Sequence, residues 1–172
     1  MSVASNRPAW EGGATTSHPA LRELAEADLC VVGLGGTGLT ALAEAERWGL
    51  SAIGLDAGVV AGGAAGRNGG FLLAGLASFY HRARAALGRP RARALYELTI
   101  EQIHRIAEET PAAVRRVGSI RLAMTGEEAT DCEHHLEALR EDQLPASGYR
   151  GGEGTGLFLP TDAAFHPLQR CR

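Results

Sequence analysis

The stretch that decides the fold is VVGLGGTGLT, from Val31 to Thr40. Its glycines at Gly33, Gly35 and Gly38 have the spacing G-x-G-x-x-G, which is typical of a turn that binds the pyrophosphate of a dinucleotide. The chain contains 23 glycines in 172 residues, so this spacing arises easily by chance. The sequence on both sides of the turn therefore decides how it is interpreted.

The flanking sequence predicts the elements that such a turn requires. The apolar run from Leu29 to Val32 predicts a strand that is buried on both faces. Gly49 ends a predicted helix whose apolar residues recur at helical spacing. These residues are Leu39, Leu42, Ala43 and Trp48. The run Ser51–Asp56 predicts a second strand that ends in an acid, so the order of elements predicts a Rossmann-like βαβ unit.

Each glycine of the turn has a separate expected role. Gly33 permits the tight turn, Gly35 lets a pyrophosphate approach the backbone, and Gly38 lets the helix pack close to the strand. The helix N-terminus, which includes Gly36 and Thr37, offers unpaired N–H groups and a partial positive charge to phosphates. The alternative is a parallel α/β unit that binds nothing and uses its glycines for packing alone.

An acid follows the second predicted strand at a suitable distance. Asp56 comes 23 residues after Gly33, close to the offset of about 20 residues at which a carboxylate binds ribose hydroxyls. NAD and FAD both fit this pattern. A 2′-phosphate would favour an arginine near the second strand, and none occurs before Arg67, so NADP is disfavoured.

The next segment resembles a known family. DAGVVAGGAAGRNGGFLLAG, Asp56 to Gly75, is similar to the loop after the second strand in the D-amino-acid oxidase and glycine oxidase superfamily. GAAGRNGG, residues 63–70, most resembles the GASGRNGG run of the branch that contains gamma-glutamylputrescine oxidases, with Ala65 in place of the serine. Outside this loop, Trp10 and residues 18–21 resemble the N-terminal arm of that branch, and residues 165–168 resemble a segment that opens a helix.

The resemblance implies that the cofactor is FAD, with this loop running past the pyrophosphate toward the isoalloxazine ring. The expected cofactor-binding residues are Gly33, Gly35, Gly36, Thr37, Gly38, Asp56, Arg67, Asn68, Gly69 and Gly70. The implied activity is oxidation of an amine or amino acid by hydride transfer to the flavin. The resemblance assigns no catalytic residue. The alternative is a non-catalytic remnant that binds a dinucleotide weakly or not at all.

Members of this family are normally much longer than 172 residues, so the chain is expected to be a truncated N-terminal part. The expected fold is an α/β fold with an FAD/NAD(P)-binding βαβ unit and the beginning of an α+β substrate domain. The predicted ranges are an N-terminal arm (1–27), an FAD-binding segment with its flavin loop (28–90), a helical segment with the start of the substrate domain (91–165), and a truncated helix start (166–172).

Further elements are predicted within residues 91–165. Residues 90–110 predict an amphipathic helix whose apolar side carries Leu95, Leu98, Ile103, Ile106 and Ala107. Residues 118–125 alternate like a half-buried strand, and residues 157–160 predict a short strand. Residues 146–156 are interpreted as a glycine-rich loop.

A charged amphipathic helix is predicted over residues 126–142. Its Cys132, His134 and His135 are placed on a solvated face and not in a metal site, because neighbours in sequence point to different helix faces.

Composition limits the partners and the location. The formal net charge of −3 does not favour nucleic acid or an anionic membrane. No apolar run reaches the roughly 20 residues of a membrane span, and no signal peptide is evident. The three scattered cysteines fit reduced thiols. We therefore expect a cytoplasmic protein with a small-molecule amine or amino-acid substrate and no bound metal; its oligomeric state stays open.

Overall fold

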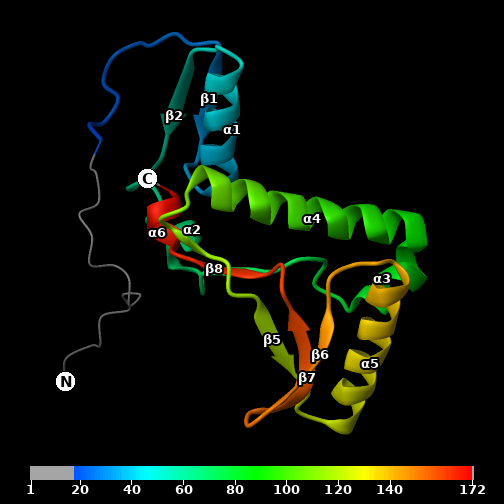
Figure 1. Ribbon diagram of the computed structural model, residues 1–172. Helices are drawn as coiled ribbons and strands as arrows, with labels where there is room; N and C mark the ends of the chain where they lie inside the picture. The colour runs from blue at the N-terminus through cyan, green and yellow to red at the C-terminus, as the bar shows by residue number, and fades with distance from the viewer. Residues whose placement is uncertain (1–17, 172) are drawn as a thin grey trace, which may run out of the picture. The chain divides into compact units, whose positions relative to one another are not determined.

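A computed structural model describes residues 18–171, which have a mixed α/β fold (Figure 1). They form two compact units: unit 1 runs up to Gly69 and includes the segment from His166 onward, and unit 2 comprises Gly70–Phe165. The predicted ranges, with their boundary at residue 90 and their cofactor and substrate functions, stay a prediction. Trp10, part of the resemblance to an N-terminal arm, lies outside the described residues.

Unit 1 contains the predicted βαβ arrangement. Strand β1 (Leu29–Val32) leads through helix α1 (Gly36–Arg47) to strand β2 (Ala52–Leu55). The two strands are parallel, with Cys30 opposite Ile53, and α1 packs against both of them (Figure 1). Because parallel neighbours cannot be joined by a tight turn, the helix supplies the crossover. The predicted fold class is confirmed.

Two burial predictions in unit 1 are wrong. Val32 is 82% exposed, although the run at β1 predicted a strand buried on both faces. Trp48 is 78% exposed and follows the last residue of α1, although the helical spacing placed it on the apolar side. In the described residues β1 pairs only with β2, and α1 contributes its small residues Gly38 and Ala45 to the interior. Hydrophobicity alone does not show which apolar residues receive a partner.

Two short helices of unit 1 pack against each other. These are α2 (Ala64–Arg67) and α6 (Pro167–Arg170). A Cβ at Gly66 would lie 2.1 Å from the carbonyl oxygen of Ala61 and 2.8 Å from a methyl group of Leu168. The close packing of α2 therefore requires a glycine at this position.

Unit 2 consists of two antiparallel sheets and three helices. One three-stranded sheet has the order β3-β8-β4, with β3 (Phe71–Leu72), β8 (Ala163–Phe165) and β4 (Val114–Arg115). The other has the order β5-β7-β6, with β5 (Ser119–Leu122), β7 (Gly154–Leu159) and β6 (Ser147–Gly151). The helices are α3 (Tyr80–Leu87), α4 (Arg89–Glu109) and α5 (Gly126–Glu141). Helix α3 packs on α4 and α5, and α5 covers β7.

The segment predicted as a glycine-rich loop is a β-hairpin. The segment contains β6 and the start of β7, which pair with each other, with Gly151 opposite Gly154. A Cβ at Gly156 would lie 1.9 Å from the carbonyl oxygen of Arg121 in the neighbouring β5. The loop prediction is wrong because strand pairing uses backbone groups, and here a glycine allows the strands to approach closely.

The core of unit 2 lies where its helices meet the β5-β7-β6 sheet. Its buried members are Tyr80, Ala83, Ala92, Tyr96, Ala138, Leu139, Leu144 and Leu159. Ile103 and Ala107 of α4 are buried as predicted, but Leu98 is 49% exposed, so its assignment to the apolar side is wrong.

The prediction of a solvated face is wrong for two residues of α5. Cys132 and His135 are buried, and only His134 of the three is exposed. Helix α5 contacts both α3 and β7, so it is covered from two directions. The prediction failed because the many charged residues elsewhere on α5 indicate a solvated helix.

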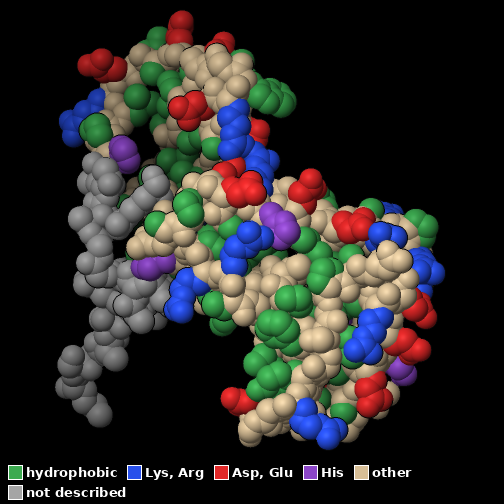
Figure 2. Space-filling view, viewed as in Figure 1, with side chains coloured by type: hydrophobic (Ala, Val, Ile, Leu, Met, Phe, Trp, Pro, Cys, Tyr) green, Lys and Arg blue, Asp and Glu red, His purple; other side chains and the backbone are tan. Residues whose placement is uncertain are grey.

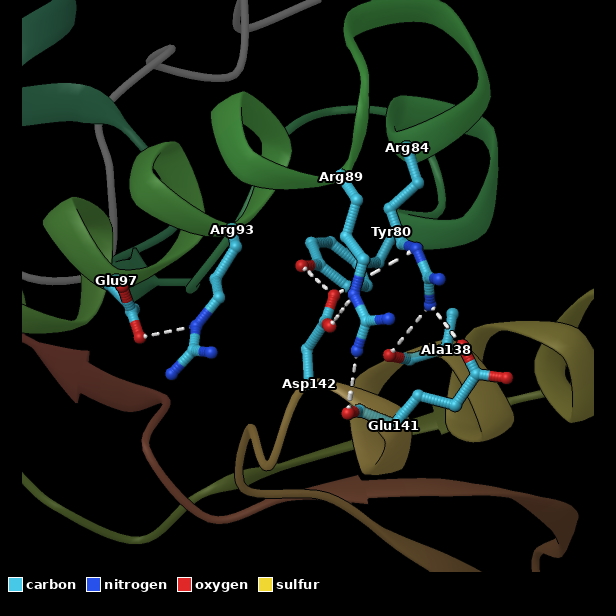
Figure 3. Close-up of polar contacts among 8 residues, drawn as sticks. All are labelled: Tyr80, Arg84, Arg89, Arg93, Glu97, Ala138, Glu141 and Asp142. Carbon is cyan, nitrogen blue, oxygen red and sulfur yellow. Dashed lines mark hydrogen bonds and ion pairs between the residues drawn. The ribbon is translucent and has the colours of Figure 1, made fainter.

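A buried carboxylate links the helices of unit 2 (Figure 3). The Tyr80 hydroxyl of α3 donates to Asp142 Oδ2 at 2.6 Å, and Arg89 Nε of α4 donates to the other carboxylate oxygen. Arg84 Nε lies 3.8 Å from the same carboxylate. Burial raises the pKa of Asp142, but the hydrogen bonds from Tyr80 and Arg89 and the nearby arginine charges outweigh it, so the pKa lies below its ordinary value.

Candidate functional site

The glycine turn in unit 1 has the backbone geometry that its first glycine allows. Gly33 has a φ of +94°, a conformation that is unfavourable for residues with a side chain. Its N–H donates to the carbonyl oxygen of Leu55 at 2.7 Å, which joins the end of β1 to the end of β2. The turn therefore forms at the carboxyl ends of both strands, where open α/β sheets bind ligands.

The third glycine permits close packing of the helix on the turn. A Cβ at Gly38 would lie 2.0 Å from the carbonyl oxygen of Gly33 and 3.2 Å from a methyl group of Val31. Any side chain here would push α1 away from β1. Gly38 thus holds the helix N-terminus at the turn, and this role is separate from any contact with a ligand.

The N-terminus of α1 is open. Gly35 is the N-cap residue; among the described residues no side chain caps the helix, and its first turn contains no acidic residue. The N–H of Leu39 bonds to the carbonyl oxygen of Gly35, so the N–H groups of Gly36, Thr37 and Gly38 precede the first intrahelical bond. A Cβ at Gly36 would meet nothing within 4 Å, and one at Gly35 would meet only Ala65, at 3.9 Å. These donors and the helix dipole suit an anion such as a phosphate.

Asp56 lies directly after β2 and receives two backbone donors. Leu34 N–H donates to Oδ2 at 2.7 Å, and Gly58 N–H donates to Oδ1 at 2.8 Å. The bonds from Gly58 and Leu34 lower the pKa of Asp56 and favour its ionised form. Each carboxylate oxygen can accept more than one hydrogen bond, so the group can still accept from a ligand hydroxyl.

A cavity of about 590 Å³ lies beside Asp56 within unit 1. One wall consists of residues 18–23, which precede β1, and the other consists of Leu34 and residues 53–60. Its volume is within the range of about 300–1,000 Å³ that is usual for small-molecule sites. The cavity places an ionised acceptor next to apolar side chains.

The predicted flavin loop begins beside the glycine turn. Ala65 of α2 contacts the position that a Cβ at Gly35 would occupy. Arg67 ends α2, and Asn68 Nδ2 donates to the carbonyl oxygen of Ala65 at 2.8 Å.

The last two predicted cofactor residues follow in sequence. Gly69 ends unit 1, and Gly70, with a φ of +71°, begins unit 2. The Gly70 carbonyl accepts from Phe165 N–H at 2.8 Å. The structure thus brings the α1 N-terminus and α2 together in unit 1 and gives Gly70 a place beside the β3-β8-β4 sheet of unit 2.

The comparison with protein families is decisive for the class of protein. The model of the DAO family, described as FAD dependent oxidoreductase, matches residues 28–172. The chain belongs to this family. The match includes the glycine turn, Asp56 and the segment from residue 63 to residue 70. A search of curated proteins gave no match.

Several solved structures have a similar fold. L-amino acid deaminase from Proteus vulgaris, with its specific insertion deleted, is 17% identical with a TM-score of 0.69, and the match covers 94% of this chain and 44% of that one. Glycine oxidase from Geobacillus kaustophilus is 21% identical with a TM-score of 0.62, covering 84% and 42%. L-proline dehydrogenase from P. horikoshii is 15% identical with a TM-score of 0.63, covering 85% and 40%. The chain thus spans less than half the length of these structures.

Sequence reasoning missed a second cavity, which lies in unit 2 and is bordered by Arg121 and the buried His135. No spacing signal in the sequence marks it, because its walls come from segments far apart in the chain. Among the described residues, no group of His, Cys, Asp and Glu side chains is arranged to hold a metal ion. None of the helices in the described part combines the length and apolar character needed to cross a membrane.

Proposed function

We propose that the chain binds FAD through the α1 N-terminus, Asp56 and the segment 63–70, and that the protein oxidises an amine or an amino acid. The observation that carries this proposal is the open N-terminus of α1. No side chain of the described residues caps its donors, and the space beside Gly35 and Gly36 is the space that a pyrophosphate requires. The residues present therefore fit the cofactor that the family implies.

Each residue has a distinct role in this proposal. The N–H groups of Gly36, Thr37 and Gly38 hold the pyrophosphate, and the partial positive charge of the helix stabilises its negative charges. Asp56 accepts hydrogen bonds from the ribose hydroxyls. Arg67 supplies charge-assisted donors. The small residues of the loop, with Asn68, Gly69 and Gly70, let the backbone lie against the cofactor.

The flavin supplies the redox chemistry: when bound, it accepts a hydride from the C–H bond next to the amine, and the resulting imine hydrolyses. The residues of this chain bind and orient the cofactor in this proposal. None of them is assigned to the chemical step.

Two observations support the substrate class. The solved structures of similar fold are named as an L-amino acid deaminase, a glycine oxidase and an L-proline dehydrogenase, and all three names refer to amino acids. The run GAAGRNGG supports a closer relation to the branch that contains gamma-glutamylputrescine oxidases, whose name points to an amine on an extended chain. We therefore propose an amine or amino acid as the substrate.

The test is the binding of FAD to the 172-residue chain, measured by quenching of flavin fluorescence, with the variants Gly35→Ala and Gly35→Val. A side chain at Gly35 occupies the space of the pyrophosphate, so we expect both variants to lose binding, and valine to have the larger effect. The added Cβ meets only Ala65 at 3.9 Å, so the alanine variant is expected to fold.

The matched control is Gly126→Ala, in the first turn of α5. Among the described residues its Cβ meets nothing within 4 Å, so the variant tests the general effect of adding a methyl group at a helix start. Loss of FAD binding in Gly35→Ala, with binding retained in Gly126→Ala and unchanged circular dichroism in both, supports the proposal. Unchanged FAD affinity in both Gly35 variants, or no binding by the unaltered chain, contradicts it.

A further inference from the structure

The segment 63–70, which is part of the proposed cofactor site, has few means of holding its own conformation. Four of its eight residues are glycine and two are alanine, so its side chains bury little apolar surface. Glycine also loses more conformational freedom on folding than any other residue. The helix within the segment, α2, has only four residues, and a helix of this length is not stable by itself. The order of the segment must therefore come from contacts with other parts of the chain.

One large apolar side chain from a distant part of the sequence packs against this segment within unit 1. Helix α6 lies beside α2 (Figure 1), and the Leu168 side chain of α6 is 6% exposed. One of its methyl groups lies 2.8 Å from the position that a Cβ at Gly66 would occupy, and Gly66 is itself buried. Helix α6 begins with the buried Pro167, whose ring fixes the backbone φ there. Leu168 thus supplies α2 with the apolar partner that its own residues lack.

The same short stretch of chain also holds the far end of the segment, within unit 2. The Phe165 N–H donates to the Gly70 carbonyl oxygen at 2.8 Å, and β8 continues this pairing along β3. Residues 165–168 therefore contact the segment 63–70 near both of its ends, although the rest of unit 2 lies between the two in the sequence.

The position of α2 determines how much room is left beside the glycine turn. A Cβ at Gly35 would lie 3.9 Å from the Cβ of Ala65, which precedes Gly66 in α2. Helix α2 therefore borders the space in which the pyrophosphate is proposed to lie. Arg67 and Asn68 end the same turn. A displacement of α2 would thus change both that space and the position of the donors proposed for the cofactor.

We propose that α6 is a positioning element of the cofactor site and that Leu168 is its positioning residue. Leu168 does not touch the cofactor in this proposal. It acts through Gly66, by holding α2 where it leaves room for a pyrophosphate at the α1 N-terminus. The inference rests on the proposed function for the identity of the ligand, whereas the ordering of α2 by Leu168 is measurable without any ligand.

The first measurement is FAD binding to the 172-residue chain, followed by quenching of flavin fluorescence. Leu168→Ala removes most of the side chain that contacts Gly66, so a smaller fraction of the chains should have an ordered α2. A ligand that needs the ordered form then binds more weakly by the same factor, and we expect FAD to bind at least about tenfold more weakly. Leu168→Met nearly conserves the volume of the side chain and should restore the affinity to within about twofold.

The second measurement is limited proteolysis with trypsin in the absence of FAD. The chain contains no lysine, so trypsin cleaves only after arginines, which are spread over the face in view (blue in Figure 2). Between Arg47 and Arg82 the one arginine is Arg67, the exposed last residue of α2. Proteolysis follows the population of locally opened states, so Leu168→Ala should raise the rate of cleavage after Arg67 at least about tenfold. The rate after Arg82, resolved by mass spectrometry in the same digest, should stay unchanged.

The matched control is Leu144→Ala. Leu144 is also a leucine that is 6% exposed, but it belongs to the core of unit 2. Its truncation should lower the thermal unfolding temperature and leave FAD affinity and cleavage after Arg67 unchanged, when both are measured well below that temperature. This control separates the positioning of α2 from a general loss of stability. A milder variant, Leu168→Val, should give smaller changes than Leu168→Ala in the same directions, and it replaces the alanine variant if that variant does not fold.

Three results would overturn the proposal. The first is cleavage after Arg67 that is as slow in the alanine and valine variants of Leu168 as in the unaltered chain. The second is FAD affinity that is equal in the unaltered chain and in these two variants. The third is an equal loss of FAD affinity in Leu144→Ala. Failure of the proposed function gives a different result, because the unaltered chain would then bind no FAD, while Leu168→Ala would still accelerate cleavage after Arg67.

Discussion

The buried imidazole of His135 predicts a loss of stability in weakly acidic solution. Burial, together with the charges of Arg121 and His81, lowers the pKa of His135 from 6.5 to about 4. The side chain is 5% exposed, and its Nδ1 accepts from Tyr80 N–H at 2.8 Å, which requires an unprotonated nitrogen. Protonation therefore costs the folded state both a hydrogen bond and the burial of a charge.

The direction and size of the effect follow from proton linkage. Between about pH 6.5 and about pH 4 the unfolded chain binds a proton that the folded chain does not, so stability falls as the pH falls through this window. Lowering the pH from about 7 to about 5 should reduce the free energy of unfolding by about 2 kcal/mol through His135 alone. The measured interval from about pH 7 to about pH 5 lies above the ordinary pKa of the carboxylates, about 3.9 for Asp and about 4.3 for Glu, so they contribute little to the loss of stability within it.

Urea unfolding followed by circular dichroism at the two pH values measures this loss. The variant His135→Asn retains an acceptor oxygen for Tyr80 N–H but does not titrate, so we expect it to lose about 2 kcal/mol less than the unaltered chain. His81, whose pKa is also lowered by burial, is present in both proteins, so its contribution largely cancels in the comparison. An identical pH dependence in the two proteins would refute the reasoning.

Three further predictions concern single substitutions. Gly38→Ala should lower the thermal unfolding temperature and reduce the free energy of unfolding by about 1–3 kcal/mol, because the new methyl group would lie 2.0 Å from a carbonyl oxygen. Gly36→Ala, where a Cβ meets no described residue within 4 Å, should leave the unfolding temperature unchanged. Asp142→Ala should cost about 1–3 kcal/mol in urea unfolding, because it leaves the buried Tyr80 hydroxyl without its acceptor. Ala65→Ser should tighten FAD binding about twofold to tenfold, as measured by flavin fluorescence, by adding one hydrogen-bond donor to the proposed site.

Each of these predictions has a control or a contrary result. Equal unfolding temperatures in the two glycine variants would contradict the packing role of Gly38. The control for Asp142 is Glu97→Ala, which removes an exposed ion pair with Arg93 (Figure 3) and should cost less than about 1 kcal/mol. Unchanged or weaker FAD binding in Ala65→Ser would contradict the proposal that residue 65 of α2 lies beside the cofactor.

The sequence alone was sufficient to predict the βαβ unit. The spacing of Gly33, Gly35 and Gly38 reflects requirements of the local backbone. The structure shows two of them: Gly33 has a positive φ, and Gly38 allows the helix to approach the turn closely. The position of Asp56 can also be predicted from the local sequence. Asp56 directly follows β2, and the crossover helix makes β2 the neighbour of β1. The proposed cofactor-binding segment 63–70 was recognised only by its resemblance to a family, since its small residues have no periodicity.

Only the tertiary structure decided which residues are buried and which groups meet in space. Cys132 and His135 are buried because α5 is covered from two sides, and the residues of the α5 sequence do not reveal this. Most of residues 146–156 form strands because β6 pairs with β7 and β7 pairs in turn with β5. Arg121 in sequence is an ordinary charged residue of an alternating strand. Its contact with Phe79 and the cavity beside it exist because segments distant in the chain pack together, and packing at such separations leaves no spacing pattern in the sequence.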